Sequence, residues 1–145
     1  MQPWSARIRT ARPTDAAALA VLSTELGYAS TEAQVRQRLR LLDDPERELL
    51  VVDAPDGLAG FIDVHVQRLV ETDPFGEIGG LVVAKPHRGK GLGRALLAAA
   101  AAWCRQRDLQ EMWIRANLGR VGAHEFYDAI GCRVVKDQRV YAYPR

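Results

Sequence analysis

The chain has 145 residues, of which 48% are hydrophobic and 26% are charged, and this is the ordinary composition of a soluble globular domain. At this length we expect a single domain over residues 1–145, large enough to bury its own core without a metal or disulfides. The net charge is +2, from 20 Lys and Arg against 18 Asp and Glu, which is too small to indicate a nucleic-acid partner.

The sequence shows no segment typical of a membrane span or of export. The longest run without polar residues, Ala95–Cys104, has ten residues, whereas a membrane-spanning helix needs about 20. The segment Met1–Pro13 lacks the apolar stretch of a signal peptide. Because Cys104 and Cys132 are too few for a disulfide framework or a zinc site, we expect a cytoplasmic protein with reduced thiols and no metal.

The first third of the chain predicts one strand and two helices. Alternating side chains over Ala6–Arg12 favour a short strand. Leucines at helical spacing then predict a helix that starts at Pro13-Thr14-Asp15 and ends at Gly27. A second helix is expected to begin at a cap formed by Ser30 or Thr31.

The middle of the chain is rich in strand signals. Two β-rich runs, Glu48–Ala54 and Leu58–Val66, flank a Pro-Asp-Gly sequence and predict a hairpin. A polar loop is expected over Gln67–Gly76, followed by a strand over Glu77–Ala84. Within that strand, Gly79-Gly80 indicates a β-bulge or a close approach of another backbone.

The C-terminal part predicts two helices and three strands. A long helix is expected over Gly91–Arg107, a strand over Met112–Ala116 and a short helix over Val121–Ile130 that ends at a glycine. Val134-Val135 and Val140–Tyr143 are predicted to be closing strands. The element order is that of a mixed α/β domain, with parallel pairing expected only around the long helix.

The stretch that carries chemistry runs from the end of a strand into the long helix. Three glycines within five residues let the backbone turn tightly and approach a ligand. The unpaired amides of the first helical turn and the helix dipole favour an anion there, and Arg88, Lys90 and Arg94 add positive charge. The sequence therefore predicts a phosphate or pyrophosphate site.

Two common phosphate-binding motifs do not fit this stretch. A Walker loop requires a glycine where Ala84 stands and a Ser or Thr where Gly91 follows Lys90. A Rossmann fingerprint requires a third glycine, and Leu96 occupies its position.

The glycine-rich stretch and a second segment resemble the GNAT family of acetyltransferases. Arg88-x-x-Gly91-x-Gly93 matches the family signature [QR]-x-x-G-x-[GA], and Ala123–Gly131 resembles its A-x-x-F-Y-x-x-x-G-F segment. The resemblance covers nearly the whole chain. It implies the α/β GNAT fold, with a mixed central sheet of about six to seven strands, a splayed fourth strand and about four flanking helices.

The resemblance implies an acetyl-CoA-dependent N-acetyltransferase that transfers the acetyl group directly to a primary amine in a ternary complex. The backbone of Leu81, Val82 and Val83 would bind the pantetheine arm, and Asn117 is a further candidate for this contact. The pyrophosphate would be bound by the glycine-rich loop, whose residues are Arg88, Gly89, Lys90, Gly91, Leu92, Gly93 and Arg94.

Acetyl transfer needs a base for the amine and an acid for the leaving thiolate, because an alkyl amine with a pKa of about 10.4 is charged at neutral pH. Tyr127 matches the family tyrosine that protonates the thiolate. Glu77, at the start of its predicted strand, occupies the position of the family's catalytic glutamate. His65 and Asp63, which share one face of the preceding strand, are alternative bases.

The sequence departs from the family pattern at two positions. Arg120 stands where the family often has an asparagine that contacts pantetheine, and Cys132 replaces the aromatic residue of the second motif. The arginine followed by A-H-x-F-Y resembles a branch that acetylates small amines and aminoglycosides. We therefore expect a small-molecule acceptor such as an aminoglycoside or a polyamine, and neither a nucleic-acid nor a membrane partner.

Two other functions are compatible with the same fold. One is a protein or peptide N-terminal acetyltransferase, and the other is a non-catalytic acyl-CoA sensor. The presence of both Tyr127 and Glu77 favours an enzyme, since a sensor would use neither. We expect the first two helices, the loop Gln67–Gly76 and the C-terminal hairpin to form the acceptor site, and the resemblance is also compatible with a homodimer.

Overall fold

The computed structural model of the chain describes residues 7–117 and 119–144. They belong to two compact units, Met1–Ile114 and Arg115–Arg145. Among the described residues, all five strands and the helices α1, α2 and α3 lie in the first unit, and α4 (Val121–Ala129) lies in the second.

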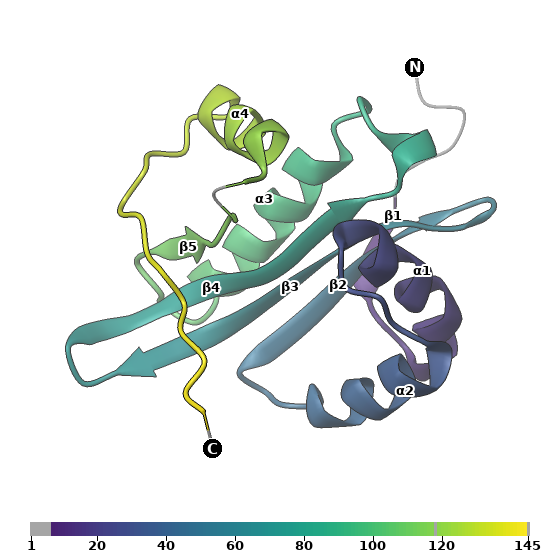
Figure 1. Cartoon of the computed structure of the whole chain (residues 1–145), viewed down its shortest axis with the longest axis horizontal. Coiled ribbons are helices and arrows are strands. Elements are labelled where there is room, and N and C mark those ends of the chain that lie inside the picture. Colours follow the sequence, from purple (N-terminus) through teal and green to yellow (C-terminus); the bar gives the residue numbers. More distant parts are fainter. Residues whose placement is uncertain (1–6, 118, 145) are drawn as a thin grey trace. The chain divides into compact units, whose positions relative to one another are not determined.

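The first unit is built on a mixed sheet with the strand order β1-β2-β3-β4-β5 (Figure 1). Strands β1 to β4 pair antiparallel in sequence order, and β5 pairs parallel to β4. The parallel pair is joined through α3 (Leu92–Arg105), as predicted, because parallel neighbours need a long crossover connection. The strands are β1 (Arg7–Thr10), β2 (Arg47–Ala54), β3 (Gly57–Leu69), β4 (Thr72–Val83) and β5 (Met112–Ile114).

Helices cover both faces of this sheet (Figure 1). Phe61 of β3 packs into a cluster with the apolar side chains of α1 (Ala16–Leu26). At its neighbour Gly60, a Cβ atom would lie 3.5 Å from the Leu96 side chain of α3. Because successive residues of a strand point to opposite faces, α1 and α3 lie on opposite sides of the sheet.

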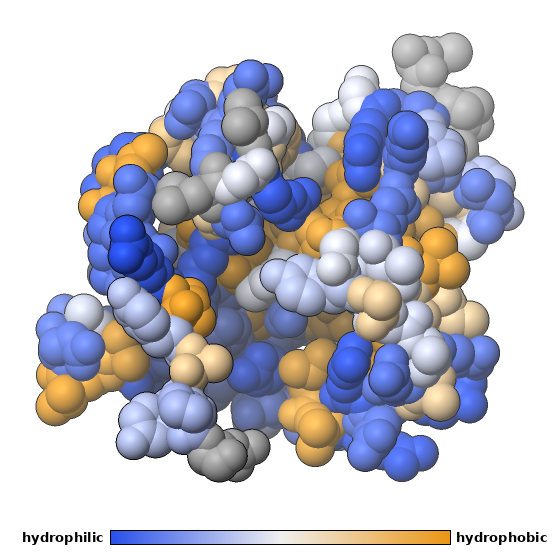
Figure 2. All heavy atoms as spheres, in the orientation of Figure 1, coloured by the Kyte–Doolittle hydropathy of each residue, from blue (hydrophilic) through white to orange (hydrophobic). Residues whose placement is uncertain are grey.

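The core on the α1 side also includes α2 (Glu32–Leu41). Leu19 and Leu22 of α1 and Val35 of α2 are buried in one cluster with Val51 of β2. Burial of a side chain of this size contributes about 1.5–3 kcal/mol, so this cluster is what holds the two helices on the sheet. The outward side of α2 is rich in charged residues, and the surface over this helix is mostly hydrophilic (Figure 2).

The ends of α1 and α2 follow their sequence signals. α1 ends at Gly27, whose φ of 114° is readily adopted only by glycine. Of the two predicted caps of α2, the structure uses Thr31: its hydroxyl accepts a hydrogen bond from the Gln34 amide at 3.2 Å. The Gln34 side chain in turn accepts from the Thr31 amide at 3.0 Å, which completes a capping box.

A charged network ties β1 to α1 and β2. The Arg9 guanidinium donates to Asp15, at the start of α1, at 2.8 and 2.9 Å. It also donates twice to Asp53 of β2, at 2.9 Å. These hydrogen bonds to Arg9 lower the pKa of both carboxyls below the usual value, so both remain charged at neutral pH.

The polar loop predicted over Gln67–Gly76 is wrong, because β3 and β4 form one long hairpin there. Gln67 pairs with Phe75 and Leu69 with Thr72, which leaves only residues 70 and 71 outside the strands. The hydrogen bonds of this hairpin join backbone groups and do not depend on the side chains. Its polar side chains therefore show no strand pattern in the sequence. Glu77 consequently lies within β4 and not at its start.

The closing strands predicted at Val134-Val135 and Val140–Tyr143 are also wrong. None of residues 132–144 is in a strand, so the described sheet has five strands and not six to seven. β-branched and aromatic residues favour a strand only where a neighbouring strand offers pairing and a surface to pack on. Val140, by contrast, is 95% exposed.

Candidate active site

The candidate site begins at a bulge in β4. Asp63 of β3 pairs with Gly80 and Val64 pairs with Ile78, so Gly79 is the extra residue on β4. This confirms the bulge that the two glycines predicted. A bulge bends the strand that carries it, and the pairs between β4 and β5 end at Ile78. Among the described residues, the segment 81–83 therefore pairs with β3 on one side and with no strand on the other.

The loop after β4 presents uncapped amides at the start of α3. Gly89 and Gly91 both have φ of 80°, and a Cβ at either position would meet no atom within 4 Å. Backbone conformation, and not lack of space, is therefore what requires glycine here. No described side chain caps α3, and the amides of Leu92, Gly93 and Arg94 have no partner within the helix. This is the geometry that an anion-binding loop needs.

The Arg88 side chain connects this loop to α1. Its Nε donates to the Val83 carbonyl at 2.9 Å, and its Nη2 lies 3.5 Å from Glu25 Oε1. The same Glu25 oxygen accepts from the Lys85 amide at 2.7 Å. No sequence pattern indicates this role for Glu25, because Glu25 lies on α1, 60 positions before Lys85. Arg88 thus already binds the Val83 carbonyl. Arg94, by contrast, is an exposed cation in the first turn of α3.

Glu77 and His65 form a buried pair across β4 and β3. They are register partners, and Glu77 Oε1 lies 3.4 Å from His65 Nε2. The two side chains are only 10% and 15% exposed, so Glu77 is a largely buried carboxylate. In the described part of the chain, His65 Nδ1 has no hydrogen-bond partner. A carboxylate beside an imidazole at a sheet surface can accept and pass on a proton.

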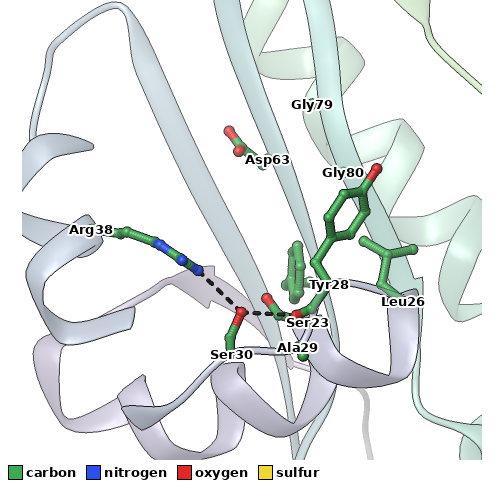
Figure 3. Close-up of a pocket in the computed structure, with 10 residues that line it drawn as sticks. Ser23, Leu26, Tyr28, Ala29, Ser30, Arg38, Asp63, Gly79 and Gly80 are labelled. Carbon is green, nitrogen blue, oxygen red and sulfur yellow. Dashed lines mark hydrogen bonds between the residues drawn. The ribbon is translucent and has the colours of Figure 1, made fainter. Parts of the chain in front are cut away.

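A cavity of about 580 Å³ lies between the α1–α2 connection and the bulged part of the sheet (Figure 3). Asp63 lines it, whereas Glu77 and His65 do not. Residues of α1, of α2 and of the connection between them line this cavity, at positions that no sequence pattern marked. The lining residues are Ser23, Leu26, Tyr28, Ala29, Ser30, Arg38, Phe61, Asp63, Gly79 and Gly80.

The second unit carries Tyr127 on α4. Its ring meets Phe126 edge to face, with 5.3 Å between the ring centroids. Burial raises the pKa of the Tyr127 phenol, which keeps the proton available to a leaving group.

In the same unit, Asn117 Oδ1 accepts from the Gly119 amide at 2.8 Å, and the Asn117 carbonyl accepts from His124 at 2.9 Å. The side-chain oxygen and the backbone carbonyl of Asn117 therefore stabilise the local turn.

Sequence comparison identifies the class of protein. Residues 16–132 match the Acetyltransferase (GNAT) family. A relative, aminoglycoside N(6')-acetyltransferase type 1 of Stenotrophomonas maltophilia, is 33% identical over 129 residues, which cover 86% of this chain and 84% of the relative. The chain therefore belongs to the GNAT family, and it is an acetyl-CoA-dependent N-acetyltransferase, as its two motifs implied.

Solved structures of two proteins share this fold. The aminoglycoside 6'-N-acetyltransferase AAC(6')-Ig of Acinetobacter haemolyticus has a TM-score of 0.82 at 19% identity, over 96% of this chain and 99% of that one. AAC(6')-Iy, in complex with the bisubstrate analogue CoA-S-monomethyl-acetylneamine, has a TM-score of 0.82 at 18% identity, over 98% and 100% of the two chains. They confirm the predicted α/β GNAT fold with a mixed sheet and four helices.

Proposed function

We propose that this chain, as one domain, transfers the acetyl group of acetyl-CoA directly to the primary amine of a small molecule. The observation that carries the proposal is the bulged end of β4, which leads into the uncapped start of α3. Its relative from Stenotrophomonas maltophilia bears the name of an aminoglycoside acetyltransferase. Aminoglycosides are therefore the first acceptors to test, followed by polyamines.

In this proposal the donor lies along β4 and the loop that follows. The free backbone groups of Leu81, Val82 and Val83 bind the pantetheine arm as a neighbouring strand would, with Asn117 as a further contact. The pyrophosphate lies against the amides of residues 88–94, where the α3 dipole and Arg94 add positive potential. Arg88 contributes charge from its position between Val83 and Glu25.

Glu77 is the proposed base and Tyr127 the proposed acid. When bound, acetyl-CoA supplies a thioester carbonyl carbon that the amine attacks. Glu77 takes one proton from the ammonium group, directly or through His65 or a water molecule, so that the nitrogen lone pair becomes available. Burial raises the pKa of Tyr127, so the phenol is protonated at neutral pH. As the carbon–sulfur bond breaks, Tyr127 gives this proton to the thiolate, and the second proton that the amine nitrogen loses restores the phenol.

We also propose that the enzyme works in the cytoplasm. Cys104 is buried and Cys132 exposed, and both are free thiols, which suits a reducing compartment. In the part of the chain that the structure describes, no helix is both long enough and apolar enough to cross a bilayer.

A turnover assay tests the proposed reaction. The purified chain is mixed with acetyl-CoA and a panel of aminoglycosides, polyamines and peptides, and the free CoA thiol is measured over time. Saturable release that depends on a small amine is expected. Release with peptide N-termini alone would indicate a protein acetyltransferase, and CoA binding without any amine-dependent release would indicate a sensor.

A further inference from the structure

Asp63 is a carboxylate that no described residue pairs with through a hydrogen bond or an ion pair. It lies on β3, partly buried, and lines the cavity between the α1–α2 connection and the sheet (Figure 3). Burial raises the pKa of this carboxyl, while the charges of Arg47 and His65 act against that rise. An unpaired polar group removed from water costs free energy. Its position on a cavity wall therefore points to a ligand that brings a positive charge.

Gly79 keeps this carboxylate open to the cavity. A Cβ at position 79 would lie 3.3 Å from Asp63 Oδ2 and 3.5 Å from Asp63 Cγ. Gly79 is not among the glycines with positive φ, so its backbone conformation is available to any residue. The bulge and the missing side chain together leave room in front of the Asp63 oxygens.

The other charged groups around Asp63 are already held by neighbours or lie apart from the cavity. On β4 and β3, Glu77 and His65 face each other at 3.4 Å, and Arg47 is the register partner of His65 on β2. On α2, Arg38 donates to the Ser30 hydroxyl at 3.0 Å (Figure 3). Asp63 is the one carboxylate among the residues that line the cavity.

The ammonium group that Asp63 would bind is unlike the one that reacts. A carboxylate that stays paired with the reacting nitrogen would hold its proton and oppose attack, and Glu77 is the proposed base. Asp63 and His65 are two residues apart on β3, which separates their Cα atoms by about 7 Å, and Glu77 lies opposite His65. An acceptor that reaches both carboxylates needs two nitrogen atoms at about this separation.

We propose that Asp63 binds a second, non-reacting ammonium group of the acceptor, so that the preferred substrates carry two amino groups. The inference rests on the proposed acetyl transfer and adds a specificity-determining residue to it. It predicts that, between two amines of equal length, the one with a second positive charge is preferred.

Two amines of equal length provide the test: 1,4-diaminobutane and n-butylamine. For the wild-type chain we expect kcat/KM to be at least about tenfold higher with the diamine, after division by two for its two equivalent nitrogens. In Asp63→Asn this preference should fall below about twofold. Asp43→Asn, which removes the charge of an exposed loop residue, should keep the wild-type preference.

A second variant and a binding measurement cover the other outcomes. Gly79→Ala places a methyl group against the Asp63 oxygens and should lose the preference as well. Calorimetric titration of 1,4-diaminobutane into the chain with CoA present should show binding to the wild type and at least tenfold weaker binding to Asp63→Asn. Circular dichroism checks that both variants fold.

The outcomes separate the inference from the reaction on which it rests. If the wild type acetylates amines but does not prefer the diamine, or if Asp63→Asn keeps that preference, the inference is wrong while the proposed function stands. If no amine is acetylated, the proposed function is wrong and the calorimetric comparison decides the role of Asp63. Equal diamine binding by the wild type and Asp63→Asn, or binding by neither, overturns the inference.

Discussion

Asp63 shows how a residue suited to binding can weaken the fold that carries it. Its carboxyl has a raised pKa, chiefly because burial disfavours the charged form. The folded state therefore holds this proton to a higher pH than the unfolded state does, and stability falls as pH rises from the ordinary value near 3.8 through the folded pKa.

This sign leads to a stability prediction. Asp63→Asn removes the buried charge, so its melting temperature at pH 7 should equal or exceed that of the wild type. The difference should shrink as the pH falls below about 4, because the wild-type carboxyl then becomes protonated in the unfolded state as well. Thermal melts from pH 3 to pH 8 measure it, and a clearly lower melting temperature for the variant at pH 7 would show that Asp63 stabilises the fold.

Tyr127 gives the second prediction at the scale of a residue. Tyr127→Phe keeps the ring against Phe126 and removes only the hydroxyl proton. We expect kcat to fall about 100-fold, a typical contribution of a general acid, while the Kd for CoA changes less than about twofold. Tyr143→Phe, at an exposed position, is the matched control. An unchanged kcat in Tyr127→Phe would leave this residue with a packing role only.

Among the elements, the loop into α3 owes its function to backbone conformation. In Gly91→Glu the side chain meets open space, but a non-glycine residue at φ of 80° costs about 1–2 kcal/mol and the carboxylate repels an anion. CoA binding should be lost while the fold remains. Gly57→Glu is the control for strain, because its φ of 128° is at least as unfavourable for a non-glycine residue and the space is also open.

Calorimetry with CoA and a far-ultraviolet circular dichroism spectrum of each variant check this prediction. The control should keep wild-type affinity for CoA, and both variants should keep the wild-type spectrum. Wild-type affinity in Gly91→Glu would mean that the pyrophosphate does not lie at the start of α3.

Elements with strong local signals could be predicted from the sequence. Gly27 ends α1, Thr31 caps α2, and Gly79 forms the bulge in β4. These features depend on steric and hydrogen-bonding rules that act within a few residues. The extension of β3 and β4 into a long hairpin could not be predicted in this way, because its polar side chains carry no alternating pattern and its bonds join separate backbones.

At the scale of the whole molecule, the sequence by itself determined the family, the glycine-rich loop and the two catalytic candidates. Those inferences depend on residue types at fixed spacings, such as Arg88 to Gly93 and Phe126-Tyr127. A spacing within one element brings residue types together and favours a backbone conformation before any tertiary contact forms.

Only the tertiary structure decided which charges share a surface. It places Glu77 in a buried pair with His65 and Arg88 beside Glu25, and it leaves Asp63 unpaired on the wall of the cavity between the α1–α2 connection and the sheet. Each of these facts depends on strands and helices that are distant in sequence coming within a few ångströms. The free energy of a charge depends on its solvent and its neighbours, and both are set only when the chain has folded.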